Sequence, residues 1–144
     1  MLDGEGDIRE RFAKYREKFK IEYKQVNEAF QKSIQTAAQI TKEHIKLPDS
    51  ESVRIEYLDG APWSAYNWYK GNYKSLIQLN KLADIYIERV FDIAAHESYP
   101  GHHVYYSLRE KEYYRDKGYV ELVSIHYFLQ YHYLLKVPLS MQMN

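Results

Sequence analysis

The chain has 144 residues, and its 20 lysine and arginine side chains are balanced by 20 aspartate and glutamate side chains. This neutral balance argues against nucleic acid or an anionic membrane as the main partner, and no apolar run reaches the length of a membrane span. Because there is no cysteine, disulfides are excluded and any zinc must be held by histidine and carboxylate side chains. The length predicts a single domain, 1–144, and the first residues do not resemble a signal peptide, which favours a cytoplasmic location.

Residues 1–50 are predicted to form mainly one long amphipathic helix. Apolar side chains recur every three or four residues from Ile8 to about Ile45, which is the spacing of one helical face. Leu47-Pro48-Asp49 is a typical helix end. We expect this helix to pack on its own domain; the alternative is the arm of a coiled-coil dimer.

Residues 51–82 are predicted to hold strands and a loop. Apolar and charged residues alternate over 53–57, which predicts a short half-buried strand. A second strand is predicted over 73–80, with Ile77 and Leu79 facing the core. The aromatic-rich segment between these strands is expected to be irregular, because a turn and a proline precede it.

Two residues of that aromatic-rich segment, Tyr66 and Asn67, are candidate substrate contacts. The strand that precedes the helix 85–97 can bind an extended peptide along an exposed edge, while side chains of the peptide enter pockets. An ordinary hairpin that covers the helix is the alternative, and the sequence does not separate the two.

The segment 96–103, His-Glu-Ser-Tyr-Pro-Gly-His-His, carries the strongest functional signal. It follows a helix predicted from Ile85 onward and capped by Asp84. On an unbroken helix His102 would point away from His96, and His103 would return to the same face only about two turns, or roughly 10 Å, further along, which is too far for one metal ion to be shared. The intervening proline and glycine predict a break that returns His102 toward His96. A helix end capped by histidines is the alternative.

The residues 94–103, Ala-Ala-His-Glu-Ser-Tyr-Pro-Gly-His-His, resemble the signature of the bacterial domain-of-unknown-function 885 family of zinc-peptidase-like proteins. Residues 66–73 are similar to that family as well. The resemblance implies a zinc-dependent peptidase with Zn²⁺ on His96 and His102 and with Glu97 as the general base. It also implies a further glutamate ligand in a Glu-Gly segment that this chain lacks, so the chain is expected to be a fragment of a zincin-like catalytic domain.

Three further residues are candidates for the same site. Glu121, in the helix predicted after the motif, is a geometrically conceivable metal ligand, and His126 is another. His103, or a tyrosine, is a candidate for stabilising the oxyanion of a peptide-hydrolysis intermediate.

The fold class predicted from these elements is mainly α with a small β-hairpin or sheet, that is, α+β. The remaining segment 83–144 would hold the metal-site helix, a helix over 104–116 and an almost wholly apolar helix over 119–135. Such a helix belongs inside a larger structure or in a homo-oligomer. The competing functional hypothesis is therefore a non-catalytic helical interaction domain, or a degenerate relative, that self-associates through 119–135.

Overall fold

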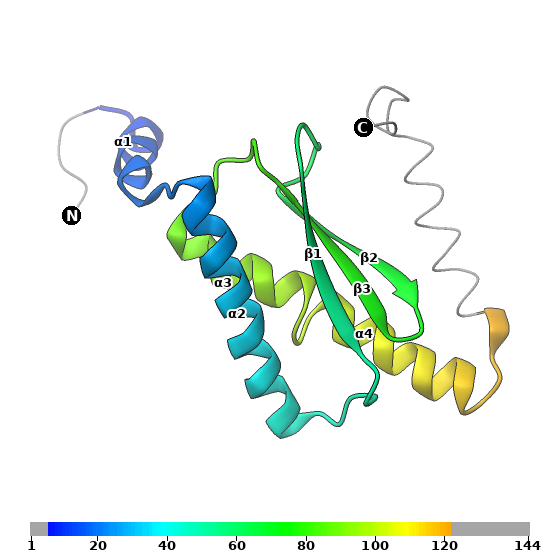
Figure 1. The fold of residues 1–144 in the computed structure, drawn as a ribbon. Helices are drawn as coiled ribbons and strands as arrows, with labels where there is room; N and C mark the ends of the chain where they lie inside the picture. The colour runs from blue at the N-terminus through cyan, green and yellow to red at the C-terminus, as the bar shows by residue number, and fades with distance from the viewer. Residues whose placement is uncertain (1–5, 122–144) are drawn as a thin grey trace.

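The computed structural model describes residues 6–121, which form an α+β fold with a three-stranded mixed sheet (Figure 1). In chain order the elements are α1 (Ile8–Arg16), η1 (Glu17–Phe19), α2 (Tyr23–His44), β1 (Ser52–Leu58), β2 (Ala65–Gly71), β3 (Lys74–Asn80), α3 (Ile87–Glu97), α4 (His102–Arg109) and the π-helix η2 (Glu110–Arg115). Among these described residues, no helix combines the length and the apolar composition that a membrane span requires.

The strands are ordered β1-β3-β2, with β1 parallel to β3 and β2 antiparallel to β3. Val53 of β1 is paired with Ser75 of β3, and Asn67 of β2 is paired with Ile77. The strands predicted over 53–57 and 73–80 are confirmed as β1 and β3. The segment expected to be irregular is instead the edge strand β2, whose tyrosines and tryptophan are residue types that favour strands.

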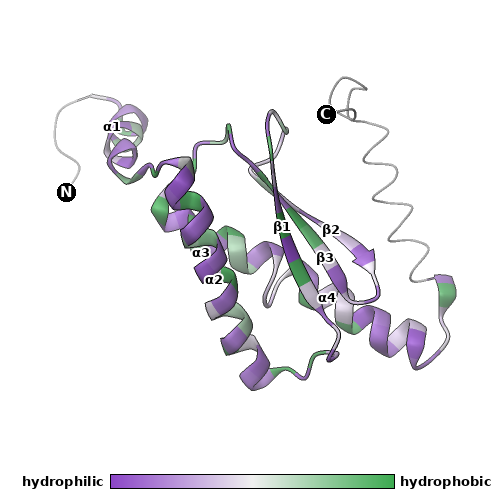
Figure 2. Ribbon diagram, in the orientation of Figure 1, coloured by the Kyte–Doolittle hydropathy of each residue, from purple (hydrophilic) through white to green (hydrophobic). Residues whose placement is uncertain are grey.

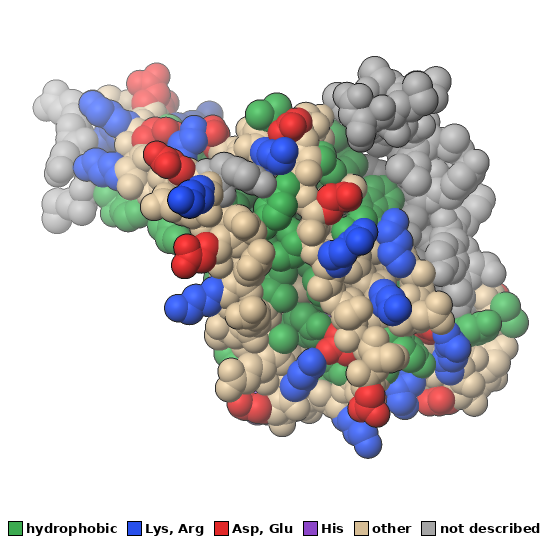
Figure 3. All heavy atoms as spheres, viewed as in Figure 1, with side chains coloured by type: hydrophobic (Ala, Val, Ile, Leu, Met, Phe, Trp, Pro, Cys, Tyr) green, Lys and Arg blue, Asp and Glu red, His purple; other side chains and the backbone are tan. Residues whose placement is uncertain are grey.

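The helices α2, α3 and α4 share one hydrophobic core with the sheet. Phe30 of α2 and Ile77 of β3 are fully buried in it, and Leu79 is almost so, as predicted for the inward face of β3. Hydrophobic residues recur among hydrophilic ones along α2 (Figure 2). Those at helical spacing on one side of the helix, including Val26, Phe30 and Ile34, lie in the core. In the space-filling view, hydrophobic side chains line the seam between α2 and the sheet (Figure 3).

The prediction of one continuous helix from Ile8 to about Ile45 was wrong. The chain leaves the helical conformation at Lys20 (φ −67°, ψ 132°), which forms an isolated bridge with Tyr86. The next helix, α2, then starts at Tyr23, and its N-cap residue Glu22 donates a hydrogen bond from its N–H to the Gln25 side chain at 3.2 Å. The apolar stripe continues across this interruption, so the sequence pattern alone conceals it.

The prediction that Asp84 caps a helix starting at Ile85 was also wrong. The helix α3 begins at Ile87, and Asp84 forms an ion pair with Lys20. The helical segment expected over 104–116 is confirmed as α4 followed by η2, and Gly118 ends it with a φ of +74°. Most of the predicted helix 119–135 lies outside the described residues.

Candidate metal centre

The predicted interruption of the metal-site helix is present. The helix α3 ends at Glu97, the chain turns through residues 98–101, and α4 begins at His102. Ser98 closes the end of α3, because both its N–H and its hydroxyl donate to the Ala94 carbonyl. This fully buried serine therefore supplies a cap inside the core, where water cannot satisfy the carbonyl.

Gly101 allows the turn to close tightly against α3. A Cβ atom at this position would lie 1.8 Å from the His96 carbonyl oxygen and 2.5 Å from the Ala95 carbonyl oxygen, distances at which atoms collide. The Gly101 N–H donates to the same Ala95 carbonyl at 3.1 Å. Only glycine fits here, and the reason is this close backbone approach.

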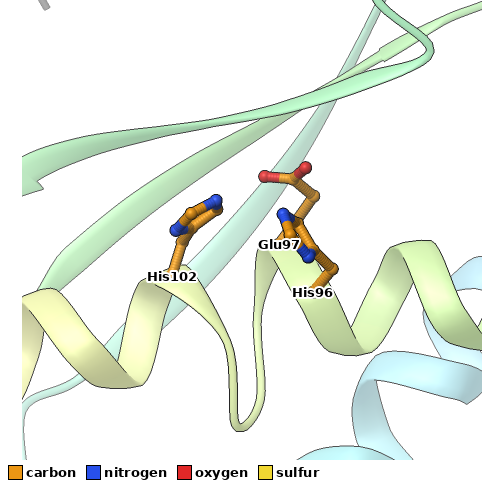
Figure 4. A group of neighbouring side chains, drawn as sticks. All are labelled: His96, Glu97 and His102. Atoms are coloured by element: carbon orange, nitrogen blue, oxygen red, sulfur yellow. The ribbon is translucent and has the colours of Figure 1, made fainter.

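The turn brings His96, Glu97 and His102 together. One ligand atom from each residue lies within 4.8 Å of the other two, and the rings of His96 and His102 are nearly perpendicular with centroids 4.7 Å apart. Two nitrogens bound to one zinc ion lie at most about 4 Å apart, so small side-chain rotations suffice. In Figure 4 the three side chains project from the facing ends of α3 and α4 to the same side, toward the sheet.

Glu97 is a buried carboxylate whose exposed fraction is 8%. Its Oε2 atom has no hydrogen-bond partner among residues 6–121. Burial raises the pKa of Glu97, and the neighbouring charge of His96 and the Asn67 backbone only partly oppose this. A buried carboxylate left without a full set of partners is costly unless a proton, a cation or a ligand satisfies it.

The two histidines of the cluster have different environments. His96 is exposed and His102 is partly buried. Burial, followed by repulsion from His96, lowers the pKa of His102, which favours the neutral imidazole that metals bind. The ring of Tyr106 stacks one helical turn below His102, with centroids 6.0 Å apart.

Asn67, predicted as a substrate contact, lies directly against the cluster. Its side-chain amide donates to the Glu97 carbonyl oxygen at 2.6 Å. Its Oδ1 atom is buried without a hydrogen-bond partner in the described part of the chain. Tyr66, its neighbour on β2, packs instead against the rings of Trp63 and Trp68, and alternation along the strand places it on the opposite face of the sheet.

His103, the candidate for stabilising the oxyanion, does not belong to the group formed by His96, Glu97 and His102. Its ring is fully buried, with Nδ1 2.8 Å from the Ser75 hydroxyl and Nε2 2.8 Å from the Glu51 carboxylate. Both ring nitrogens are therefore already engaged. Consecutive residues of a helix point about 100° apart, so His102 and His103 cannot face the same space.

The predicted further ligands do not complete the site within residues 6–121. Glu121 is exposed and does not belong to the group formed by His96, Glu97 and His102. His126 lies outside the described residues. The remaining coordination positions of a bound ion would therefore need water, substrate or a ligand beyond this part of the chain.

A cavity of about 490 Å³ opens beside the cluster and is lined by both His96 and Glu97. Ala65, the first residue of β2, forms part of its wall. The cavity is lined by both signs of charge, from Arg16 and Arg89 and from Asp84 and Asp92. Each arginine is already paired with a carboxylate, Glu88 and Asp92 respectively. The cluster is thus accessible from a polar pocket that borders the sheet edge.

The residues that are distant from the motif in sequence but contact it in the fold were not identified from the sequence. Glu51 and Ser75 contact His103 but are 52 and 28 residues away from it. Glu110 is a further buried residue that was not identified. Its carboxylate accepts hydrogen bonds from the Tyr69 hydroxyl at 2.6 Å and from Arg115. No local pattern marks these residues, because their partners come from other elements.

Comparisons of the chain with models of protein families, with curated proteins and with solved structures gave no match. The functional interpretation therefore depends on the geometry of the His96, Glu97 and His102 cluster.

Proposed function

We propose that the chain is part of a zinc-dependent metallohydrolase, with a peptide as the substrate class that fits best. The observation that carries this proposal is the cluster itself. Two imidazoles and a buried carboxylate converge across a helix interruption, within 4.8 Å of one another. Residues 94–103 also resemble the domain-of-unknown-function 885 signature, a resemblance of the motif residues alone, since no family model matches the chain.

The residues present fit a zinc ion. Imidazole nitrogen and carboxylate oxygen are donors that zinc accepts, and the incompletely satisfied Glu97 carboxylate gains a partner from a cation or its bound water. His96 and His102 would hold the ion. When bound, zinc supplies a Lewis acid that lowers the pKa of coordinated water and polarises a carbonyl.

Glu97 is the proposed general base. Burial raises the pKa of Glu97 above that of an exposed glutamate, toward neutral pH. This direction suits a group that accepts a proton from water and then passes it to the leaving amine. Asn67 holds the Glu97 backbone through the 2.6 Å hydrogen bond and thereby fixes the base relative to β2.

The edge strand β2 supports a peptide as substrate. Its second edge is not paired with another strand of the described sheet, and it runs past Glu97 at Asn67. An extended peptide can add to such an edge through backbone hydrogen bonds, with side chains entering the neighbouring cavity. A hydrolase that acts on another carbonyl substrate is the variant of this proposal that the cluster alone does not distinguish.

Zinc titration of the metal-free protein by calorimetry tests the proposal. We expect stoichiometric binding in the wild type and its loss in His96→Ala and His102→Ala. His44→Ala is the matched control, because His44 is exposed at the end of α2 and lies outside the cluster. Absence of zinc binding by the folded wild type would contradict the proposal and favour the non-catalytic interaction domain.

The alternative function, a non-catalytic interaction domain, leads to a different expectation. A self-associating domain would form concentration-dependent oligomers whose mass does not change with a chelator. The segment 119–135 to which this association was assigned lies mostly outside the described residues, so nothing in the described fold favours it. Light scattering with and without chelator separates the two functions.

A further inference from the structure

A second buried carboxylate lies behind the candidate metal centre. The Glu51 side chain is only 4% exposed, although it belongs to the loop that precedes β1. Its Oε1 atom accepts from the Lys42 ammonium at 2.6 Å. Its Oε2 atom accepts from the Tyr99 hydroxyl and from His103 Nε2. One carboxylate thus joins the end of α2, the turn 98–101 and the first turn of α4.

Two of these partners flank the metal-binding position. Tyr99 lies in the turn before His102, and His103 follows His102 directly. Because a carboxylate only accepts, His103 Nε2 donates to Glu51, and Nδ1 lies at hydrogen-bond distance from the Ser75 hydroxyl on β3. The His103 ring is therefore held at both nitrogens by groups on other elements.

Holding His103 fixes the direction of His102. Neighbouring residues of a helix differ in direction by about 100°, so a fully buried His103 determines how α4 is rotated about its axis. That rotation directs the His102 ring toward His96, at the observed centroid distance of 4.7 Å. Four residues separate the two helices, so the contacts of His103 add to the hydrogen bonds of the turn in setting this rotation.

We infer that Glu51 is a positioning residue for the metal centre, which acts by bonding Tyr99 and His103 on either side of His102. This inference deepens the proposed function and rests on it for its zinc readout. Lys42 supports this role, because its ammonium group is an opposite charge beside the buried Glu51 carboxylate. Outer groups that orient metal ligands typically change metal affinity by about 10- to 100-fold when removed.

The test compares Glu51→Gln with the wild type in zinc affinity, measured by competition with a chromophoric chelator. We expect Glu51→Gln to weaken zinc binding about tenfold or more at a temperature where circular dichroism shows both proteins folded. Tyr99→Phe removes one of the three hydrogen bonds and is expected to weaken binding less. Glu56→Gln is the matched control, because Glu56 is an exposed β1 residue that pairs with Gln78.

A metal-free readout keeps this inference separate from the proposed function. Nuclear Overhauser contacts between the ring protons of His96 and His102 report their approach without zinc. We expect these contacts in the wild type and in Glu56→Gln, and their weakening in Glu51→Gln. If the wild type binds no zinc, the proposed function fails while the ring contacts still test the positioning role. Unchanged ring contacts in folded Glu51→Gln, together with unchanged zinc affinity wherever zinc binds, would overturn the inference.

Discussion

His96 and His102 belong to different helices, yet their rings meet at nearly a right angle with centroids 4.7 Å apart. The pair forms because α3 stops one residue after His96 and α4 starts at His102. A continuous helix would point the two rings in different directions. The interruption is thus the structural condition for any shared ligand.

Glu97→Gln should retain zinc binding and lose hydrolysis. Glutamine is nearly isosteric with glutamate but cannot accept a proton at neutral pH, so the rate should fall about a hundredfold or more. Zinc titration and cleavage of a fluorogenic peptide mixture measure the two effects. Glu88→Gln, at an exposed position on the same helix, is the control. Loss of zinc binding in Glu97→Gln would identify Glu97 as a ligand instead of a base.

Gly101→Ala should destabilise the fold by about 3 kcal/mol or more, because its Cβ would lie 1.8 Å from the His96 carbonyl oxygen. Chemical denaturation measures the free energy of unfolding. Gly60→Ala is an informative control, since Gly60 has a φ of +75° but open space around its Cβ position. It should cost only about 1 kcal/mol, from backbone strain. Equal losses in the two variants would argue against the close approach.

Stability should depend on pH through Glu51. Burial alone would raise its pKa, but hydrogen bonds from His103, Lys42 and Tyr99 outweigh burial and lower the pKa to about 2. A carboxyl whose pKa is lower in the folded state stabilises above its unfolded pKa of about 4.5, and this stabilisation is lost as the pH falls toward 2. The full effect is on the order of 3 kcal/mol.

Urea denaturation between pH 7 and pH 3 checks this linkage. The difference in unfolding free energy between the wild type and Glu51→Gln should be largest above pH 5 and should shrink toward pH 3. The corresponding difference for Glu56→Gln should stay small throughout, because Glu56 is an exposed residue. A Glu51→Gln difference that does not change with pH would refute the assigned cause.

Tyr69→Phe should destabilise the fold by about 1.5–3 kcal/mol. Its hydroxyl donates at 2.6 Å to the Glu110 carboxylate, which is only 6% exposed, and hydrogen bonds to buried charged groups are expensive to remove. Thermal and chemical denaturation measure the change. Tyr105→Phe, at a 56% exposed position, should change stability by less than about 0.5 kcal/mol. Similar effects of both changes would show that the Tyr69 hydroxyl contributes little.

Sequence reasoning succeeded where a local pattern determines the structure. Alternation over 53–57 and 73–80 predicted β1 and β3, because a strand buried on one face repeats every second residue. Pro100 and Gly101 predicted the interruption between His96 and His102, since they change the backbone within the motif itself.

The predictions failed where distant contacts determine the structure. The helix 8–45 is interrupted at Lys20 by a bridge to Tyr86, a residue 66 positions away. His103 stands next to His102 in the sequence, but its two nitrogens contact Ser75 of β3 and Glu51 of the loop before β1. Partners that are distant in sequence leave no periodic pattern in the residues around them. The direction of the His103 side chain at the start of α4 could therefore not be predicted from the sequence.

The parallel register of β1 on β3 makes the strand boundary before Ser52 intolerant of insertions. Val53 is opposite Ser75, which places the residue two positions earlier, Glu51, beside the His103 ring that Ser75 also contacts. One extra residue between Glu51 and Val53 would reverse the faces of the strand or carry the carboxylate about 3.3 Å along the sheet. An insertion before β1, far from the histidines in sequence, would thereby break the contact between Glu51 and His103 although every residue of the motif was unchanged.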